Sequence, residues 1–218
     1  MNGAAATAQM NRIYRRQRHI YDFTRRYYLL GRDELIERLG VMPGHRVLEM
    51  GCGTGRNLIV AASRYPETRF YGVDVSTEML TSAREALGQA AQSSRIRVEH
   101  GDAAAFDPRA TFGIERFDRV FVAYTLSMIP QWKLAIDKGL MLLAPGGEFH
   151  VVDFGGQKAW PGIARYALRR WLSAFHVTPR EDLENVLKMH TIDRGARLIF
   201  ERRLGDYVQY GRLILPSA

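Results

Sequence analysis

The segment Val47-Leu48-Glu49-Met50-Gly51-Cys52-Gly53-Thr54-Gly55 is the strongest indication of the fold class of this chain. Apolar residues with the composition of a buried strand lead directly into three glycines that alternate with other residues. Alternating glycines let the backbone turn tightly and approach a ligand closely, and backbone N–H groups at a helix start favour a negative group. The stretch therefore predicts a strand, a ligand-binding loop and a helix, which together begin a βαβ unit.

Short β-branched runs alternate with longer helical runs along the rest of the chain, which predicts a mainly parallel sheet. Two last runs, 196–204 and 207–215, predict a hairpin that turns at Gly205-Asp206. The fold class is thus α/β, a Rossmann-like domain with a seven-stranded, mainly parallel sheet, an antiparallel C-terminal hairpin and an amphipathic N-terminal helix. We expect the other strands over 46–50, 69–73, 96–100, 119–123 and 148–154, and helices over 10–30, 32–39, 55–65, 77–92, 131–143 and 179–189.

The spacing of the glycines separates this loop from a dinucleotide loop. Pyridine-nucleotide enzymes usually carry Gly-x-Gly-x-x-Gly, which holds a pyrophosphate. This chain has Gly-x-Gly-x-Gly with an acid, Glu49, two residues before the first glycine. The pattern resembles the first motif of class I S-adenosylmethionine-dependent methyltransferases, whose product is S-adenosylhomocysteine. The resemblance implies that Glu49 orders the loop and balances the cofactor's ammonium, and that the loop binds the cofactor through Gly51, Cys52, Gly53, Thr54 and Gly55.

Three further motifs follow in the order that this family shows. Asp74 ends strand two, where an acid can take both ribose hydroxyls, and Asp102 follows strand three, where the family's acid bonds the adenine amino group. Leu143-Ala144-Pro145-Gly146-Gly147 precedes strand five. Met79 matches a position that covers the adenine face. The alternatives are that Met79 is ordinary core, that Asp102 caps a helix, and that the whole domain keeps the fold without binding. The predicted cofactor-binding residues also include Val75, Ala103 and Ala123.

The length of 218 residues suits one α/β domain with modest additions. We expect a disordered tail over 1–9 and a single methyltransferase domain over 10–218. The tail lacks the apolar stretch of a signal peptide, and no run reaches the roughly 18 apolar residues of a membrane span. Cys52 is the only cysteine, which excludes an internal disulfide and fits a reducing cytosol. The domain has four parts: basic helices over 10–40, the cofactor-binding core over 46–154, a basic aromatic insert over 155–178, and a terminal helix and hairpin over 179–218.

The positive charge is gathered in two segments. A net charge of +8 draws the protein to phosphate-bearing partners. Residues 1–46 hold nine arginines against four acids, and residues 155–176 hold four Lys and Arg residues and no acid. Aromatic residues interleave both groups, as in helices that lie in a lipid interface. We therefore expect residues 10–30 and 155–176 to contact an anionic membrane surface; the alternative is a lid whose arginines face solvent.

Nucleic acid is not the expected partner, despite the basic charge. Methylases of adenine and cytosine amino groups resemble one another in an Asn/Asp-Pro-Pro-aromatic segment after strand four, which seats a flipped base. This chain has Ala123-Tyr124-Thr125-Leu126-Ser127-Met128-Ile129-Pro130 there, and it lacks a Pro-Cys nucleophile. The six histidines are scattered, so we expect no metal site. The sequence does not indicate an oligomeric state.

A narrower resemblance concerns the methyl acceptor. The stretch His19-Ile20-Tyr21-Asp22-Phe23-Thr24-Arg25-Arg26-Tyr27-Tyr28-Leu29-Leu30-Gly31-Arg32-Asp33, with Gly53-Thr54-Gly55-Arg56-Asn57, is similar to bacterial N-methyltransferases of betaine-lipid synthesis. This implies a cytoplasmic enzyme, peripheral on the inner face of the membrane, that converts diacylglycerylhomoserine to its trimethyl form in three steps. The alternatives are a phosphatidylethanolamine N-methyltransferase, a methyltransferase of a soluble amine or quinone-like ring, and a cofactor-binding or membrane-binding protein without turnover.

The acceptor amine must lose a proton before it attacks, and a nearby side chain can accept that proton or relay it to water. The candidates are Tyr21, Tyr124 and His150, in that order. Their alternative roles are to cover the cofactor, to line the pocket and to face the sheet, respectively. Tyr28 and Arg32 are expected to hold a carboxylate of the cofactor or of a homoserine headgroup. The alternative for Arg32 is a salt bridge within the next helix.

Overall fold

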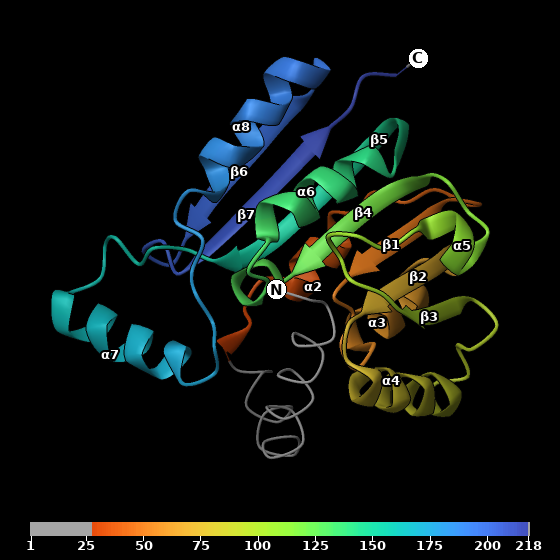
Figure 1. Ribbon diagram of the computed structural model, residues 1–218, viewed down its shortest axis with the longest axis horizontal. Coiled ribbons are helices and arrows are strands. Elements are labelled where there is room, and N and C mark those ends of the chain that lie inside the picture. The colour runs from red at the N-terminus through yellow and green to blue at the C-terminus, as the bar shows by residue number, and fades with distance from the viewer. Residues whose placement is uncertain (1–27, 218) are drawn as a thin grey trace.

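The computed structural model describes residues 28–217, and within this range seven strands form one sheet in the order β3-β2-β1-β4-β5-β7-β6 (Figure 1). Strands β1 to β5 run parallel, whereas β7 is antiparallel to both of its neighbours, β5 and β6. The predicted mainly parallel α/β sheet is confirmed. The last hairpin is more than an added edge, because β7 lies inside the sheet. The strands are β1 Arg46–Met50, β2 Arg69–Asp74, β3 Ile96–His100, β4 Phe117–Ala123, β5 Leu143–Phe154, β6 Arg197–Arg203 and β7 Val208–Ile214.

Helices cover both faces of the sheet, and each face has its own apolar cluster. One cluster contains Leu35, Leu58 and Leu80 from three helices: α2 Arg32–Glu37, α3 Arg56–Arg64 and α4 Thr77–Gln89. The other contains Phe112, Ile136 and Leu187 from α5 Pro108–Phe112, α6 Trp132–Met141 and α8 Leu183–Arg194. Burial of apolar side chains on both faces explains why the central strands read as nearly continuous apolar runs.

Two elements lie at the carboxyl ends of the parallel strands. The short 3-10 helix η1 Leu126–Met128 follows β4, and α7 Gly162–Ser173 follows β5. Figure 1 shows α7 projecting to the left of the sheet. In open α/β sheets ligands bind at this carboxyl edge. The fold therefore places the glycine loop, η1 and the basic insert at one end of the molecule.

Most predicted elements are confirmed, and three details differ. Ser76 is the N-cap of α4, as expected, and its hydroxyl accepts the Met79 N–H at 3.3 Å. The helix expected from residue 179 begins at Leu183 instead, because the preceding residues are bonded to the turn after β4. Helix α5, capped by Asp107, was not expected. The turn at 145–147 falls within the span of β5, where the pairing with β4 shifts register. Apart from its last residues, the helix expected over 10–30 lies outside the described part of the chain.

Candidate functional site

The loop after β1 is held in a glycine-dependent conformation. Gly51, Gly53 and Gly55 have φ values of 78°, 53° and 75°, the left-handed region that favours glycine. The N–H groups of Gly51 and Cys52 both donate to the carbonyl of Val73 at the end of β2, at 2.8 and 3.0 Å. A Cβ on Gly51 would lie 2.1 Å from Cγ2 of Thr125. The loop is thus pressed between the ends of β2 and β4.

Glu49 is a buried acid directly beneath this loop. Its side chain is 1% exposed, and Oε1 accepts a hydrogen bond from Asn57 at 2.7 Å. The other oxygen, Oε2, has no hydrogen-bond partner among the described residues. Burial raises the pKa of Glu49 to about 8, although the bond from Asn57 and the charge of Arg32 oppose this. A buried carboxylate oxygen without a donor fits a ligand that brings one, such as an ammonium.

Asp74 is the last residue of β2 and Asp102 follows β3 by two residues, as the sequence predicts. The Asp74 carboxylate accepts the N–H of Gly53 at 2.8 Å and of Ser76 at 2.9 Å, so it ties the glycine loop to the start of α4. Asp102 is exposed and accepts the N–H of Ala104 at 2.9 Å. Three other residues that the sequence assigns to the cofactor lie at the ends of β2, β3 and β4: Val75 and Ala123 are half-buried and Ala103 is buried.

Met79 lies in a small apolar cluster that joins three parts of this edge. It is 4% exposed and packs with Met128 of η1 and with Phe175, which follows α7. Its burial agrees with both a core role and an adenine-covering role. The cluster shows that the cofactor-binding core and the basic insert meet at η1.

Aromatic rings continue this contact toward α7. Tyr28 stacks on Phe154, the last residue of β5, at 6.4 Å and meets Trp171 of α7 edge-on at 4.8 Å. Tyr124 also contacts Phe154, at 4.7 Å. Arg32 donates from Nε to the carbonyl of Leu29 at 3.2 Å, and its charge acts on both Glu49 and Tyr124. The structure therefore brings Tyr28, Arg32 and Tyr124 together beside the glycine loop.

The structure describes two of the three predicted proton acceptors, Tyr124 and His150. Tyr21 lies outside the described residues. The phenol of Tyr124 donates to the carbonyl of Leu30 at 2.5 Å, and burial raises its pKa well above the usual range. A phenol that is fully used as a donor and resists ionisation is poorly suited to accept a proton. Tyr124 lines the site, and the geometry gives it a structural part there.

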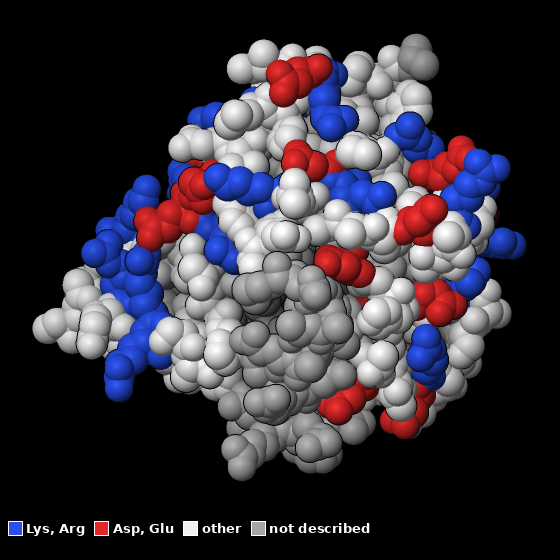
Figure 2. Space-filling model, in the orientation of Figure 1, with Lys and Arg blue, Asp and Glu red and all other residues white. Residues whose placement is uncertain are grey.

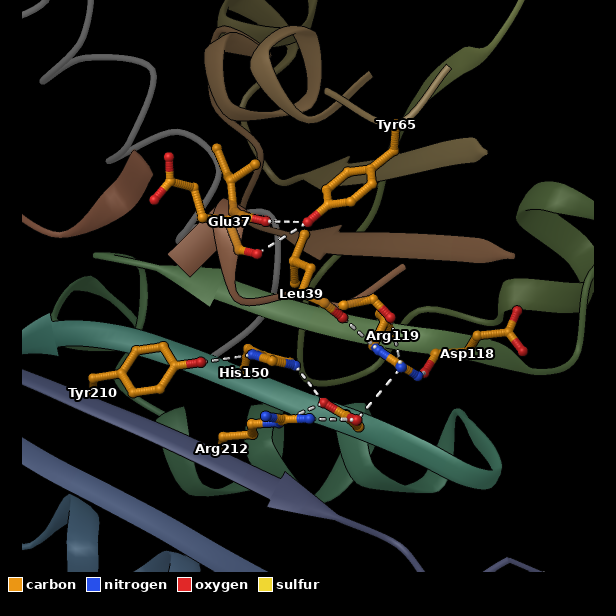
Figure 3. A network of polar contacts seen from close by, with 11 residues as sticks. Glu37, Leu39, Tyr65, Asp118, Arg119, His150, Tyr210 and Arg212 are labelled. Carbon is orange, nitrogen blue, oxygen red and sulfur yellow. Dashed lines mark hydrogen bonds and ion pairs between the residues drawn. The ribbon is translucent and has the colours of Figure 1, made fainter. Parts of the chain in front are cut away.

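His150 lies in a separate buried network and not at the site (Figure 3). It is 0% exposed; Nε2 lies 2.9 Å from Glu148 and Nδ1 lies 2.9 Å from the hydroxyl of Tyr210. Arg212 also donates to Glu148, at 2.6 and 2.8 Å. Burial lowers the pKa of His150, so the ring is neutral, with Nε2–H donating and Nδ1 accepting. The expectation that His150 is a base is therefore replaced by the alternative: it faces the sheet and links β5 to β7.

Helix α7 exposes a basic and apolar surface. Ile163 and Tyr166 are 88% and 68% exposed, and Arg165 and Arg170 are exposed beside them. Leu172 is the one fully buried side chain of this helix. Figure 2 shows Lys and Arg side chains gathered over the α7 part of this face. No helix of the described range is long and apolar enough to cross a membrane.

Several residues of this edge were not singled out from the sequence. Asn57 stands in the quoted motif, but only its bond to Glu49 gives it a role. Thr125 packs on Gly51, and Asp153 and Arg180 hold η1 through backbone groups. The sequence carries no local signal for the last two, because their partners are distant in the chain.

Comparisons with known proteins agree with this geometry. Residues 47–147 match a family model described as a methyltransferase domain. The chain is 33% identical to trans-aconitate 2-methyltransferase of Variovorax paradoxus over 115 residues, which cover 53% of this chain and 40% of that relative. It is 28% identical over 197 residues to carboxy-S-adenosyl-L-methionine synthase of Chromohalobacter salexigens, covering 84% of this chain and 71% of the relative. The chain thus spans less than half the length of the first of these relatives.

The fold is also found in solved structures. Phosphoethanolamine N-methyltransferase 2 of Haemonchus contortus, in complex with S-adenosyl-L-methionine, superposes with a TM-score of 0.66 at 18% identity. The match covers 86% of this chain and 52% of that one, and at this identity it shows the fold.

The glycine loop, the acids at the ends of β1 and β2 and the strand order agree with the fold of class I S-adenosylmethionine-dependent methyltransferases. Residues 47–147 carry the part of this domain that the family model describes. The residues present fit the cofactor: Oε2 of Glu49 lacks a donor within the described range and is suited to the ammonium of the methionine part. Asp74 and Met79, which the sequence analysis assigns to the ribose and the adenine, lie beside this loop at the end of β2 and the start of α4.

Proposed function

We propose that this protein transfers methyl groups from S-adenosylmethionine to the amine of a lipid headgroup, with diacylglycerylhomoserine as the acceptor. The observation that carries this proposal is helix α7, which exposes basic and apolar side chains next to the cofactor end of the sheet. A soluble acceptor does not require such a surface. The proposed location is the cytoplasmic face of a membrane.

The exposed side chains of α7 suit a lipid interface. Ile163 and Tyr166 provide an apolar group and an amphipathic ring, while Arg165 and Arg170 provide charges for lipid phosphates. Each basic residue near an anionic surface contributes about 1 kcal/mol to binding. A helix that lies on the surface would bring the site to the headgroups.

The same helix is connected to the predicted acceptor side. Trp171 meets Tyr28, and Phe175 packs with Met128 and Met79. A headgroup that enters beside α7 would therefore reach the residues that border the cofactor loop. Arg32, close to Glu49 and Tyr124, is proposed to attract the carboxylate that distinguishes homoserine from ethanolamine.

The chemistry needs positioning above all. The cofactor supplies a methyl group on a positively charged sulfur. The neutral amine uses its lone pair to form the new N–C bond as the S–C bond breaks, and the amine proton goes to water or to a side chain. Orientation of the two reactants and exclusion of water supply most of the rate. Tyr21 remains the proposed proton acceptor, because Tyr124 is engaged as a donor and His150 lies elsewhere.

The proposal is tested by methyl transfer from labelled cofactor in mixed micelles. Diacylglycerylhomoserine and phosphatidylethanolamine are offered separately, with phosphoethanolamine and trans-aconitate as soluble acceptors. Label in mono-, di- and trimethylated homoserine lipid is the expected result. Label only in phosphatidylethanolamine would move the acceptor to the other lipid amine, and label only in a soluble acceptor would overturn the lipid proposal.

A further inference from the structure

A short strap, residues 177–180, joins α7 to the turn after β4. The Thr178 N–H donates to the carbonyl of Ser127 at 2.8 Å. Arg180 reaches the same turn from its side chain: Nε donates to the carbonyl of Leu126 at 3.0 Å and Nη2 to that of Ile129 at 2.8 Å. Three hydrogen bonds therefore fasten η1 and the residue after it to the strap.

The turn that the strap holds is the meeting point of the site. Thr125 donates from Oγ1 to the carbonyl of Gly51 at 3.2 Å, and its methyl group fills the space beside that glycine. Met128, two residues after η1 begins, packs with Met79 and Phe175. A shift of this turn would therefore move both the glycine loop and the apolar cover of the cofactor side.

Buried side chains of β5 and β7 hold the strap and the turn in place. Asp153, 0% exposed at the end of β5, accepts the N–H of Ser127 at 3.0 Å. Gln209 of β7 donates to the carbonyls of Arg180 and Phe154, at 2.7 and 2.8 Å. Arg180 lies over the ring of Trp132, 5.6 Å from its centroid. The Arg180 backbone is thus tied to β7, while its guanidinium lies between the Trp132 ring of α6 and the carbonyls of the turn after β4.

We propose that Arg180 is a positioning residue for methyl transfer: it holds the turn at 125–129 against the cofactor loop and transmits the position of α7 to that turn. This inference rests on the proposed function, because it takes α7 as the element that meets the acceptor's surface. Arg180 touches neither reactant in this account and acts through Thr125 and Met128.

The test compares Arg180→Ala with Arg95→Ala. Arg95 is a matched control, since it also donates to two backbone carbonyls, those of Tyr65 and Ala62 at 3.1 and 2.8 Å, but follows α4 near the opposite end of β3. Hydrogen exchange of amides 124–129 is measured in both variants, together with kcat and the KM for cofactor. Arg180→Ala is expected to speed exchange in this turn at least tenfold, to lower kcat at least tenfold and to raise the cofactor KM, because the turn packs on the glycine loop and on Met79. Arg95→Ala is expected to change neither the exchange of the turn nor kcat.

A conservative variant guards against simple loss of folding. Arg180→Lys keeps the charge and one donor group, so we expect it to recover part of the exchange protection and of kcat. Unchanged exchange at 124–129 in Arg180→Ala would overturn the positioning role, as would equal losses of kcat in both alanine variants. If the wild-type protein methylates no lipid amine, the proposed acceptor is wrong, and the exchange comparison alone decides the role of Arg180.

Discussion

The glycine loop and helix α7 lie at the same end of the sheet, but the protein holds them in different ways. The loop is tied by backbone bonds to Val73 and by Asp74, with Glu49 buried beneath it. Residues 161–167, in contrast, are all exposed, and α7 buries fully only Leu172. The cofactor side is thus organised by the protein itself, whereas the proposed acceptor side leaves most of its side chains exposed. The difference suggests that the two sides can be disabled separately.

The largest effect is expected from Gly51→Ala, which disturbs the glycine loop on the cofactor side. Alanine at a φ of 78° is strained, and its Cβ would overlap Thr125. We expect a loss of stability of about 3 kcal/mol from strain and overpacking together. The affinity for S-adenosylhomocysteine should fall at least about a hundredfold, because the loop is displaced. A hundredfold loss corresponds to about 2.7 kcal/mol of binding free energy. Urea unfolding and equilibrium titration measure the two quantities.

Gly44→Ala is the matched control for this prediction. Gly44 has a φ of 82°, but a Cβ there meets nothing within 4 Å. It should lose only the conformational cost of about 1–2 kcal/mol and keep its cofactor affinity. Equal affinities in the two alanine variants would show that the contact with Thr125 does not shape the loop.

A smaller effect is expected on the exposed half from the pair Arg165→Gln and Arg170→Gln. Removing two charges near an anionic surface should weaken binding to phosphatidylglycerol vesicles by about 2 kcal/mol, or about thirtyfold, at low salt. Cofactor binding should not change, because both side chains are exposed on α7. Sedimentation with vesicles and titration with cofactor check the two statements.

Arg46→Gln with Arg69→Gln serves as the control pair for α7. These arginines are exposed at the starts of β1 and β2, at the other end of the parallel strands. The net charge of the two double variants is the same. If both lose vesicle binding equally, the attraction is one of total charge, and α7 is not the docking element.

Glu49→Gln should weaken cofactor binding about tenfold, because it removes a single charge-assisted contact. With a pKa of about 8, Glu49 is mostly protonated at pH 7 before the cofactor binds. An ammonium beside Oε2 favours the carboxylate, so close to one proton should be released per cofactor at pH 7. Affinity should therefore rise from pH 6 to pH 8, and fall above it as the cofactor's own amino group, with a pKa of about 7.7–8.0, loses its charge.

Calorimetry in two buffers of different ionisation enthalpy measures this proton release. Glu49→Gln removes the titrating group, so the release at pH 7 should disappear along with the rise in affinity. Persistence of the release in this variant would assign the proton to another group.

The contrast between the two halves also explains what could be predicted from the sequence. The ends of β1 and β3, the glycine loop and the cap of α4 follow from local signals, and the structure confirms them. The strap does not follow, because Arg180 and its partner Leu126 are 54 residues apart. Pro179 favours a helix start locally, yet bonds to the turn after β4 keep these residues out of the helix. The cofactor side could thus be predicted from local sequence signals, whereas the structure of the proposed acceptor side depends on contacts between residues that are distant in the chain.

The smallest effect on turnover is expected from His150→Gln, which tests whether His150 lies outside both the cofactor side and the proposed acceptor side. Both ring nitrogens are bonded within the sheet, and although burial opposes it, bonds from His150 and Arg212 lower the pKa of Glu148 to about 2. Losing these bonds should cost about 1–3 kcal/mol of stability, while kcat and the acid limb of its pH profile should stay within about twofold. A general base contributes roughly a hundredfold or more. A loss of kcat of that size, or loss of one limb of the pH profile, would show that His150 takes part in proton transfer. An unchanged profile with a lower unfolding midpoint would leave it as a link between β5 and β7, where the network in Figure 3 places it.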